Sequence, residues 1–332
     1  MASSTKLNVV VAGASGETGS SIMKALLAEP AQFHVIALAR PESAGKPAYR
    51  EMSSSGTTIK AGDFRDVDTL AEQLAGADVV ISCILPIQRV ESETLIDAAH
   101  RAGVGRFLPS FWGPVMPPRG IMAVRDLRED LLDRCKRLYL PYTVVDVGMW
   151  YQVCLPEPYA PEPPIADVFI GVGNTPTAIM DKEDIGPYIA RIITDPRTLN
   201  RSVLAYGEVT TQSTIWAEVE AAMGKEIPRN SVSIPDLEAR IAELQGPVTR
   251  NPTDVGLLLE LAMSQYRHTR YVRGDNTPEH AQYLGYLDGK SLYSDLNCKS
   301  VRDFIREVVS GERDHRIYVG RDPVADATQH RT

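Results

Sequence analysis

Features that mark several common classes of protein are missing from this chain. The four cysteines in its 332 residues are widely scattered, at Cys83, Cys135, Cys154 and Cys298. They form no Cys-x-x-Cys pair, and no paired histidines accompany them. This pattern favours reduced thiols in a cytoplasmic protein over disulfides or a metal site. No uninterrupted apolar stretch approaches a membrane span, since Glu260 breaks the run 257–263. We therefore expect a cytoplasmic protein without a metal or a membrane segment.

A basic surface is also missing. The formal net charge is −8 at pH 7 and no basic stripe is present, whereas a nucleic-acid-binding protein normally carries a basic patch. The first six residues are polar, and the apolar run that follows is too short for a signal peptide. The length allows one large α/β domain or two units with a sizeable core. We expect a small-molecule substrate, and a monomer or a homodimer.

The usual catalytic motifs are absent as well. No Gly-x-Ser-x-Gly elbow exists, and the six histidines lack motif context. His268 is the one candidate among them, and the alternative is a surface histidine at the end of a helix. The single Tyr-x-x-x-Lys match, Tyr286 to Lys290, lies in a segment that reads as a turn. Because a four-residue spacing between two common residues has little specificity, we interpret this match as chance.

What the chain does contain is a glycine-rich turn after the apolar run 7–12. The turn precedes a segment, 17–29, whose apolar residues recur at helical spacing. A buried strand, a glycine turn and a helix N-terminus together form a site for a pyrophosphate, because backbone N–H groups and the helix dipole face the anion. The spacing Gly-x-x-Gly-x-x-Gly thus predicts a dinucleotide site. Its residues are Gly13, Ser15, Gly16, Glu17, Thr18 and Gly19.

The end of the next strand indicates which dinucleotide binds. The strand 34–39 ends at Arg40, where NAD-binding folds usually carry an acidic residue for the ribose 2′-hydroxyl. An arginine there accommodates a 2′-phosphate instead, and Lys46 follows in the same loop. Glu42 is close by, and a solvated surface Arg and Lys remain an alternative. We favour NADP(H) over NAD(H).

Strands and helices alternate through the first half of the chain. Further strands are expected at 57–62, 77–85, 105–110 and 142–147, with helices at 66–76, 91–102 and 121–137. Alternation of this kind predicts an α/β fold, a Rossmann-type doubly wound parallel sheet with its site at the carboxyl ends of the strands. Residues that follow two of these strands are expected beside the cofactor: Asp63, Phe64, Cys83 and Ile84.

The second half changes character. The segment 153–164 is dense in proline and can be neither regular helix nor central strand. Helices are expected at 184–194, 214–223, 235–244, 255–266 and 300–309, and a short strand at 202–206. We therefore predict a cofactor-binding domain over 1–150, a smaller α+β substrate-binding part over 151–311, and a mixed-charge tail over 312–332.

Aromatic and apolar residues just past strand ends are the candidates for a substrate pocket, because ligands of open α/β sheets bind there. Adjacent residues point in different directions, so only about half of them are expected to line it. They are Phe111, Trp112, Met149, Trp150 and Tyr151. Tyr271 and its neighbours Arg270 and Arg273 are weaker candidates for a covering loop, and Arg273 could simply hold Asp275.

Several segments, in order along most of the chain, resemble the NmrA-like and isoflavone-reductase-like group of atypical short-chain dehydrogenases, in its fungal form. Besides the glycine turn they are 37–40 (Ala-Leu-Ala-Arg), 106–110 (Arg-Phe-Leu-Pro-Ser), 140–145 (Leu-Pro-Tyr-Thr-Val-Val), 181–186 (Asp-Lys-Glu-Asp-Ile-Gly), 271–276 (Tyr-Val-Arg-Gly-Asp-Asn) and 284–286 (Leu-Gly-Tyr). The resemblance implies an NADPH-binding sheet, a smaller C-terminal substrate part, and activity on aromatic or alkaloid-like molecules.

The chain departs from the plant members of this group at two places. They carry Pro-Ser-Glu-Phe-Gly where this chain has Pro-Ser-Phe-Trp-Gly at 109–113. They also carry a lysine proton donor on the next helix, and the corresponding position here is Arg125. An arginine cannot usefully donate a proton near neutral pH, but it can stabilise developing negative charge. An Arg125 on the helix surface, paired with Glu129, is an equal alternative.

Three functions follow from these observations. The first is an NADPH-dependent oxidoreductase of an apolar aromatic or alkaloid-like intermediate in specialised metabolism. The second is a cyclase or rearrangement enzyme that uses bound NADP(H) without net turnover, which the missing lysine motivates. The third is a non-catalytic NADP(H) sensor that binds a regulatory protein, as some NmrA-like proteins do.

Overall fold

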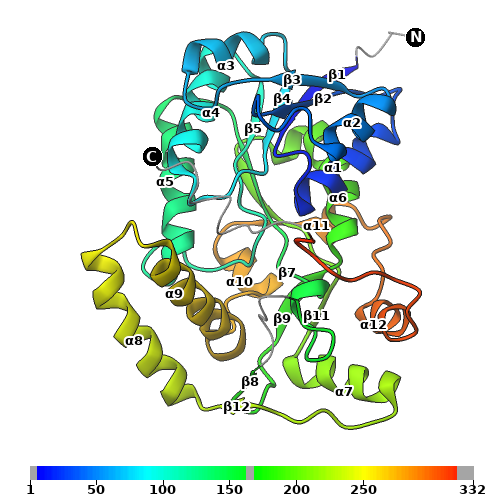
Figure 1. Cartoon of the computed structure of the whole chain (residues 1–332), viewed down its shortest axis with the longest axis vertical. Helices are drawn as coiled ribbons and strands as arrows, with labels where there is room; N and C mark the ends of the chain where they lie inside the picture. The colour runs from blue at the N-terminus through cyan, green and yellow to red at the C-terminus, as the bar shows by residue number, and fades with distance from the viewer. Residues whose placement is uncertain (1–5, 162–167, 320–332) are drawn as a thin grey trace. The chain divides into compact units, whose positions relative to one another are not determined.

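The computed structural model describes residues 6–161 and 168–319 and shows two compact units (Figure 1). The first unit runs from the first described residue to Trp112 and adds Leu127–Val145 and Ile185–Val203. The second unit contains Gly113–Asp126, Asp146–Asp184 and the chain from Leu204 onward. The units thus interleave along the chain, whereas the predicted parts 1–150, 151–311 and 312–332 follow one another. That division by function stays a prediction.

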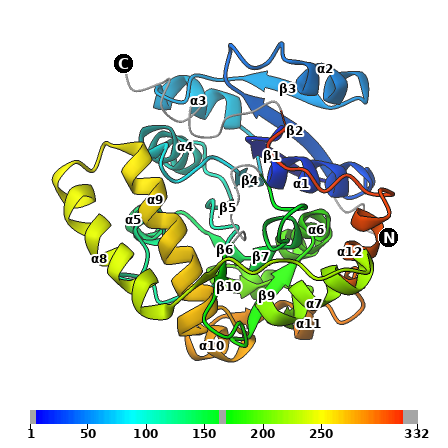
Figure 2. The same cartoon turned by 60° about the horizontal axis from the view of Figure 1, so that its bottom comes forward.

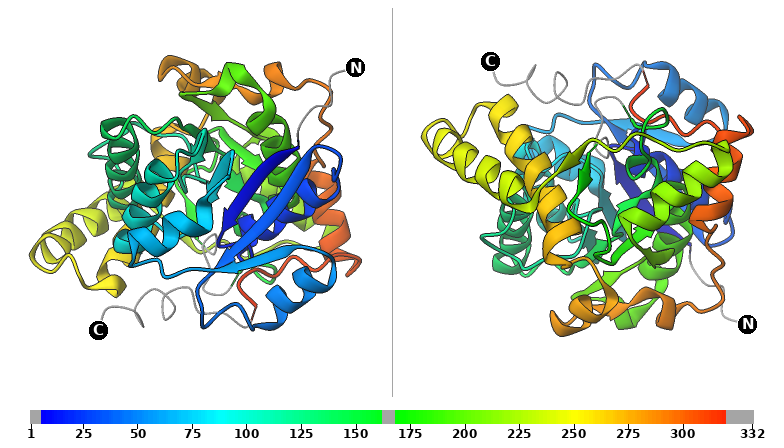
Figure 3. Two further views of the ribbon diagram at one scale, coloured as in Figure 1. Left: turned by 90° about the horizontal axis from the view of Figure 1, so that it is seen from above. Right: turned by 90° about the horizontal axis from the view of Figure 1, so that it is seen from below.

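The first unit is built on a parallel sheet. Its strands are β1 (Leu7–Ala12), β2 (Phe33–Ala39), β3 (Thr58–Ala61), β4 (Val79–Ser82) and β5 (Arg106–Leu108). They lie in the order β3-β2-β1-β4-β5, and every pairing is parallel (Figure 3). A parallel bridge from Phe107 to Tyr142 leads to β6 (Thr143–Asp146). The order reverses between β1 and β4, so the predicted doubly wound sheet is confirmed.

Helices cover both faces of this sheet (Figure 2). They are α1 (Glu17–Leu27), α2 (Pro47–Ser54), α3 (Val67–Leu74), α4 (Arg89–Arg101), α5 (Ala123–Arg137), α6 (Ile185–Thr194) and the 3-10 turn η3 (Pro196–Thr198). On one face α1 packs against α6, and on the other α3 packs against α4. Asp66 caps α3 as predicted, because its carboxylate accepts hydrogen bonds from the N–H groups of Asp68 and Thr69.

Helix α6 belongs to the first unit although it follows the start of the second along the chain. A Cβ at Gly186 would stand 2.2 Å from the Ser21 carbonyl oxygen, so only glycine allows this approach to α1. The Gly186 N–H also donates to Ser21 Oγ at 3.0 Å. Arg106, 7% exposed, donates from Nη1 to the Ile192 carbonyl at 2.7 Å and to Thr198 Oγ1 at 2.8 Å. These contacts fix the returning segment against β5 and α1.

The second unit uses much shorter strands. They are β7 (Met149–Trp150), β8 (Phe169–Ile170), β9 (Thr177–Met180), β11 (Glu208–Thr210), β12 (Ser231–Val232) and β13 (Leu287–Asp288), while β10 (Arg201–Leu204) and β6 run from one unit into the other. Three sheets result, in the orders β11-β9-β7, β13-β10-β6 and β12-β8. The predicted α+β character of this part agrees with these elements.

The helices of the second unit are α7 (Gln212–Met223), α8 (Ile234–Arg250), α9 (Val255–His268), α10 (Pro278–Tyr283), α11 (Gly289–Leu292) and α12 (Val301–Val309). Shorter turns are η1 (Tyr151–Val153), η2 (Lys182–Asp184) and the π-helical η4 (Thr269–Arg273). α8 packs along α9, and α7 along α12 (Figure 1). Within the described ranges, none of these helices combines the length and apolar character needed to cross a bilayer.

Candidate functional site

The glycine turn between β1 and α1 is held by three close approaches of backbone to backbone. Gly13 has a φ of 79°, and a Cβ there would stand 2.9 Å from the Cys83 carbonyl oxygen. A Cβ at Gly19 would come within 2.2 Å of the Gly13 carbonyl oxygen. The Gly16 N–H donates to that same oxygen at 3.0 Å. Side chains at these positions would push α1 away from the ends of β1 and β4.

The turn leaves the N-terminus of α1 suited to an anion. Gly16 is the N-cap residue and has no side chain that could accept from the first-turn N–H groups. Ser15, Gly16 and Glu17 are half-buried, and Thr18 is 7% exposed. The predicted cofactor residues of the turn therefore lie together at the point where the strand order reverses. Fixed N–H groups and the helix dipole favour a phosphate at this place.

The charged loop after β2 also lies in the first unit. Arg40 follows the strand directly, with 28% of its side chain exposed, and its Nε stands 3.2 Å from Glu42 Oε1. Two backbone hydrogen bonds, Ser43 N to the Arg40 carbonyl and Lys46 N to the Ser43 carbonyl, fold the loop into turns. Lys46 is exposed and is the N-cap residue of α2. An exposed pair of this kind is weak, so a phosphate can replace the Glu42 carboxylate at Arg40.

The other predicted cofactor neighbours differ in exposure. Asp63 is exposed and accepts from the Arg65 N–H at 2.9 Å. Phe64 is 5% exposed and packs in the core of the first unit. Cys83 is half-buried beside Gly13, and burial raises the pKa of its thiol, so the thiol stays protonated. Ile84 is 9% exposed. Contact of these four with a cofactor stays a prediction.

Trp112 lies at the carboxyl end of β4 within the first unit. Its indole Nε1 donates to the Ser82 carbonyl at 2.8 Å, and the side chain is 8% exposed. Its φ of 28° is unfavourable for a residue with a side chain. The neighbouring Phe111 is fully buried against Leu132 and Val144. Of these two predicted pocket residues, Trp112 is therefore the one placed at the strand ends.

Arg125 lies in a buried polar cluster of the second unit. Its Nη1 contacts Asp146 Oδ2 at 2.9 Å, and its Nη2 donates to the Tyr286 hydroxyl at 2.7 Å. Tyr286 in turn donates to Asp146 Oδ2 at 2.6 Å. Arg125 is 2% and Asp146 0% exposed, so the alternative of an arginine on the helix surface is wrong. A guanidinium held by Asp146 and Tyr286 is poorly placed to bind a reacting oxygen, and the catalytic role of Arg125 stays a prediction.

Tyr286 and Lys290 are not part of one constellation. Burial, with a further contribution from Asp146, raises the pKa of Tyr286. Its phenol is therefore too weak an acid to give up its proton to a substrate, although it donates a hydrogen bond to Asp146. Lys290 Nζ instead stands 5.2 Å from the ring centre of Tyr206.

His268 is half-buried at the end of α9, with Nε2 3.3 Å from Glu238 Oε1. Arg273 holds Asp275, with Nε donating at 2.6 Å.

The remaining predicted pocket residues lie in the second unit. Tyr151 is fully buried and donates to the Lys299 carbonyl at 2.9 Å. Met149 is 8% exposed and packs in the same core. Trp150 is partly exposed, although its Nε1 is buried without a hydrogen-bond partner in the described chain. Tyr271 is 4% exposed, and the Arg270 guanidinium carbon stands 4.6 Å from its ring centre.

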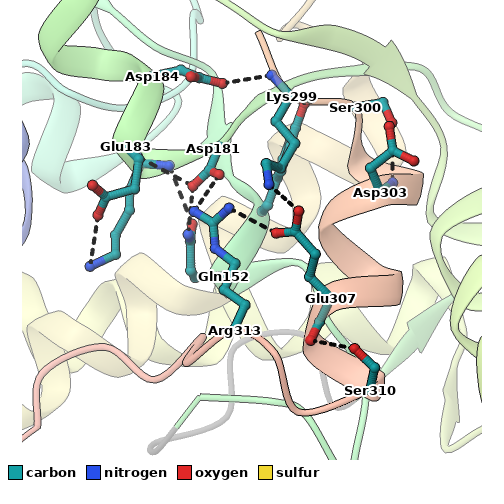
Figure 4. A network of polar contacts seen from close by, with 12 residues as sticks. Gln152, Asp181, Glu183, Asp184, Lys299, Ser300, Asp303, Glu307, Ser310 and Arg313 are labelled. Atoms are coloured by element: carbon teal, nitrogen blue, oxygen red, sulfur yellow. Dashed lines mark hydrogen bonds and ion pairs between the residues drawn. The ribbon is translucent and has the colours of Figure 1, made fainter.

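A network of charged residues joins η2 to α12 and to the segment after it (Figure 4). Arg313 pairs with Asp181 at 2.5 Å and with Glu307 at 3.4 Å, and Glu307 also pairs with Lys299. Burial, with a smaller contribution from Asp181, raises the pKa of Asp184 to about 6. The sequence does not indicate this network, because its two parts, 181–184 and 299–313, lie more than a hundred residues apart. The motif 181–186 was the one available signal.

No group of three or more histidine, cysteine or acidic residues within 6–161 and 168–319 is arranged to hold a metal ion.

Comparison with known proteins identifies the family of this chain. The model of the NmrA-like family matches residues 5–117. Asnovolin J 5′,6′-dehydrogenase of Aspergillus novofumigatus (strain IBT 16806) is 38% identical, over 94% of this chain and 98% of its own length. The chain belongs to the NmrA-like family. Eugenol synthase 1 of Petunia hybrida is 26% identical to this NmrA-like chain, over 90% of it and 98% of the synthase.

Solved structures show the same fold. The binary complex of leucoanthocyanidin reductase with NADPH from Vitis vinifera superposes with a TM-score of 0.74 at 20% identity, covering 91% of this chain and 99% of that one. A crystal structure of isoflavone reductase gives a TM-score of 0.73 at 21% identity, covering 92% of this chain and 100% of that one. These structures confirm the predicted fold, and the fungal relative confirms the predicted family.

Proposed function

We propose that this NmrA-like protein is an NADPH-dependent oxidoreductase that acts on an apolar aromatic or alkaloid-like intermediate of specialised metabolism. The observation that carries the proposal is the glycine turn, in which Gly13 and Gly19 bring backbone within distances that no Cβ would allow. Such a turn at the switch point of a doubly wound sheet binds a dinucleotide pyrophosphate. The dehydrogenase of Aspergillus novofumigatus, similar over nearly the whole chain, supports an oxidoreductase.

NADP(H) fits this turn and the loop beside it. The first-turn N–H groups of α1, from Glu17 to Gly19, would hold the pyrophosphate. Arg40, with Lys46 in the same loop, would hold the 2′-phosphate in place of Glu42. When bound, the cofactor supplies the hydride. The indole of Trp112 is hydrogen-bonded to the end of β4. It would line the nicotinamide end of the cofactor site and exclude water from it.

The substrate side of the proposal rests on apolar surface. In the second unit, Met149 and Trp150 are the predicted pocket residues next to β9 that keep some exposed surface, since Tyr151 is fully buried in its core. We place the protein in the cytoplasm, as a monomer or a homodimer with a small-molecule substrate and no nucleic-acid partner. The net charge of −8 supports the absence of a nucleic-acid partner.

A redox-neutral reaction is the second candidate. Arg125 stands where plant members of the group carry a lysine donor, and its guanidinium is held by Asp146 and Tyr286. Without a dedicated acid, orientation of the substrate beside bound NADP(H) could still promote a cyclisation or a rearrangement. The third possibility, a sensor, would need a protein partner and no turnover.

Transfer of deuterium from 4-deuterated NADPH to a panel of imine, enone and benzylic substrates tests the proposal. We expect one of the two C4-deuterated epimers to deliver its label to the product, in step with NADPH oxidation. Product formed without net NADPH loss would identify the redox-neutral enzyme. No product from any substrate, together with a regulatory protein that co-purifies, would contradict both enzymatic functions.

A further inference from the structure

Arg270 is a buried cation at an unusual place in the second unit. It lies in the π-helical turn η4, which ends at Gly274 with a φ of 68°. Only 1% of Arg270 is exposed. Single π-helical turns interrupt regular helices mostly where a functional side chain has to be presented. The π-helical turn therefore indicates a functional role for Arg270.

The partners of Arg270 supply no negative charge. Its Nη2 donates to Cys154 Sγ at 3.1 Å, and its guanidinium carbon stands 4.6 Å from the ring centre of Tyr271. Burial raises the pKa of the Cys154 thiol, and it raises the pKa of Tyr271 to about 12. Both groups are therefore neutral near pH 7, whereas an arginine stays charged. In the described chain, no carboxylate pairs with Arg270.

What this cluster lacks is an acceptor. Arg270 Nε and the Tyr271 hydroxyl are buried and make no hydrogen bond of good geometry among the described residues, and their nearest polar neighbours are each other. The Cys154 thiol already donates to the Trp150 carbonyl at 3.1 Å. Two donors and one full positive charge thus lie side by side, and leaving them unsatisfied is costly. An oxygen anion would satisfy the charge and both donors.

We propose that Arg270 and Tyr271 bind an anionic oxygen of the substrate, a carboxylate or an ionised enol. This inference rests on the proposed function and specifies its substrate: an apolar skeleton that carries one acidic oxygen. Because Arg270 is 1% exposed, the anion must reach it largely dehydrated, which favours a group carried on an apolar body over a free inorganic ion. Cys154 acts as a positioning residue that holds the guanidinium plane.

Three probes of similar size separate the possibilities: cinnamate, a carboxylate; 4-hydroxycoumarin, an acidic enol; and methyl cinnamate, which is neutral. Calorimetric titration of the full chain at pH 7, with saturating NADPH and without it, measures each affinity. We expect at least one anion to bind about 10- to 100-fold more tightly than the ester, the range for a hydrogen bond to a charged group. Arg270→Met should remove that preference and leave the affinity for the ester within about 2-fold.

Further variants keep the test decisive if Arg270→Met does not fold. Arg270→Lys keeps the charge and should keep the preference for the anion, while Tyr271→Phe should weaken anion binding a few-fold. Arg229→Met is the matched control, because Arg229 stacks on Phe169 and Trp216 in the same unit, with 42% of its side chain exposed. It should leave the preference unchanged.

The outcomes distinguish this inference from the proposed function. Preference for cinnamate alone identifies a carboxylate, and preference for 4-hydroxycoumarin alone an enolate. Anion binding without any NADPH binding would refute the proposed function and leave the anion site standing. A wild-type protein that does not prefer either anion, or an equal loss for all three probes in Arg270→Lys and Tyr271→Phe, would overturn the inference.

Discussion

The two units of this protein reach stability in different ways. The first unit has strands of up to seven residues, such as β2, whose buried apolar side chains pack under helices on both faces. The second unit has strands of two to four residues and keeps charged groups inside, among them Arg125, Asp146 and Arg270. Both units are stabilised by apolar burial, but the second also depends on charged contacts that are almost fully buried, whereas Arg106 in the first unit keeps 7% of its surface exposed.

The largest expected loss of cofactor binding and stability in the first unit comes from adding one methyl group at Gly19. Gly19→Ala would place a Cβ 2.2 Å from the Gly13 carbonyl oxygen, which is backbone and cannot yield. We expect NADPH binding to fall at least about 100-fold, and the free energy of unfolding to drop by about 1–3 kcal/mol from overpacking. Calorimetric titration and urea unfolding measure the two effects.

Gly246→Ala is the control for this change. A Cβ at Gly246 in α8 would meet only the tip of Arg250, at 3.4 Å. It should preserve binding and add up to about 1 kcal/mol through helix propensity. Unchanged NADPH affinity in Gly19→Ala would show that the turn does not carry the cofactor.

In the second unit, the corresponding change removes a buried charge. Arg125→Met leaves Asp146 in the interior without its cation, and the free energy of unfolding should fall by about 3–5 kcal/mol. The same change at Arg302, whose pair with Glu218 leaves 60% of the arginine side chain exposed, should cost less than about 1 kcal/mol. Urea unfolding of both variants makes the comparison.

Kinetics of the Arg125 variant decide between structure and catalysis. A folded Arg125→Met protein of nearly wild-type stability, with kcat reduced more than about 100-fold, would restore the predicted catalytic role and contradict the structural one.

A smaller effect concerns the network around Asp184. Its pKa lies near 6 in the folded chain against an ordinary 3.8. The folded state therefore binds more protons than the unfolded state between about pH 4 and pH 6, and the free energy of unfolding falls as the pH rises through this window. Asp184→Asn keeps an acceptor for the Lys299 N–H, 3.1 Å away, and should remove this fall.

Stability measured from pH 4 to pH 7 tests the effect. Relative to the wild type, Asp184→Asn should gain stability toward pH 7. Glu312→Gln, which changes an exposed carboxylate of the same segment, should follow the wild-type profile. Parallel profiles for wild type and Asp184→Asn would contradict the assignment.

The sequence predicted the first unit well because its signals are local. The apolar run 7–12, the glycine turn and the N-cap at Asp66 each act within a few residues. One local signal was missed: Pro47 at the first position of α2 marks a helix for which we made no prediction. Helix α6 was found, but not its place in the first unit, which depends on Gly186 meeting Ser21 far along the chain.

The polar clusters of the second unit could not be predicted in this way. Arg125, Asp146 and Tyr286 meet across 161 residues of chain, and no spacing in the sequence indicates it. Tyr271 was noticed as a loop residue, but the missing counter-charge of its neighbour Arg270 is visible only in three dimensions. Burial of a charge is a tertiary property, so local patterns do not report it.

The most direct test of the account is the choice of cofactor at Arg40. Calorimetric titration of wild type and Arg40→Ala with NADPH and with NADH measures it. We expect the wild type to prefer NADPH, and Arg40→Ala to lose about 10- to 100-fold in NADPH affinity while NADH changes less than about 2-fold. Equal losses for both cofactors, or no preference for NADPH in the wild type, would contradict the central claim.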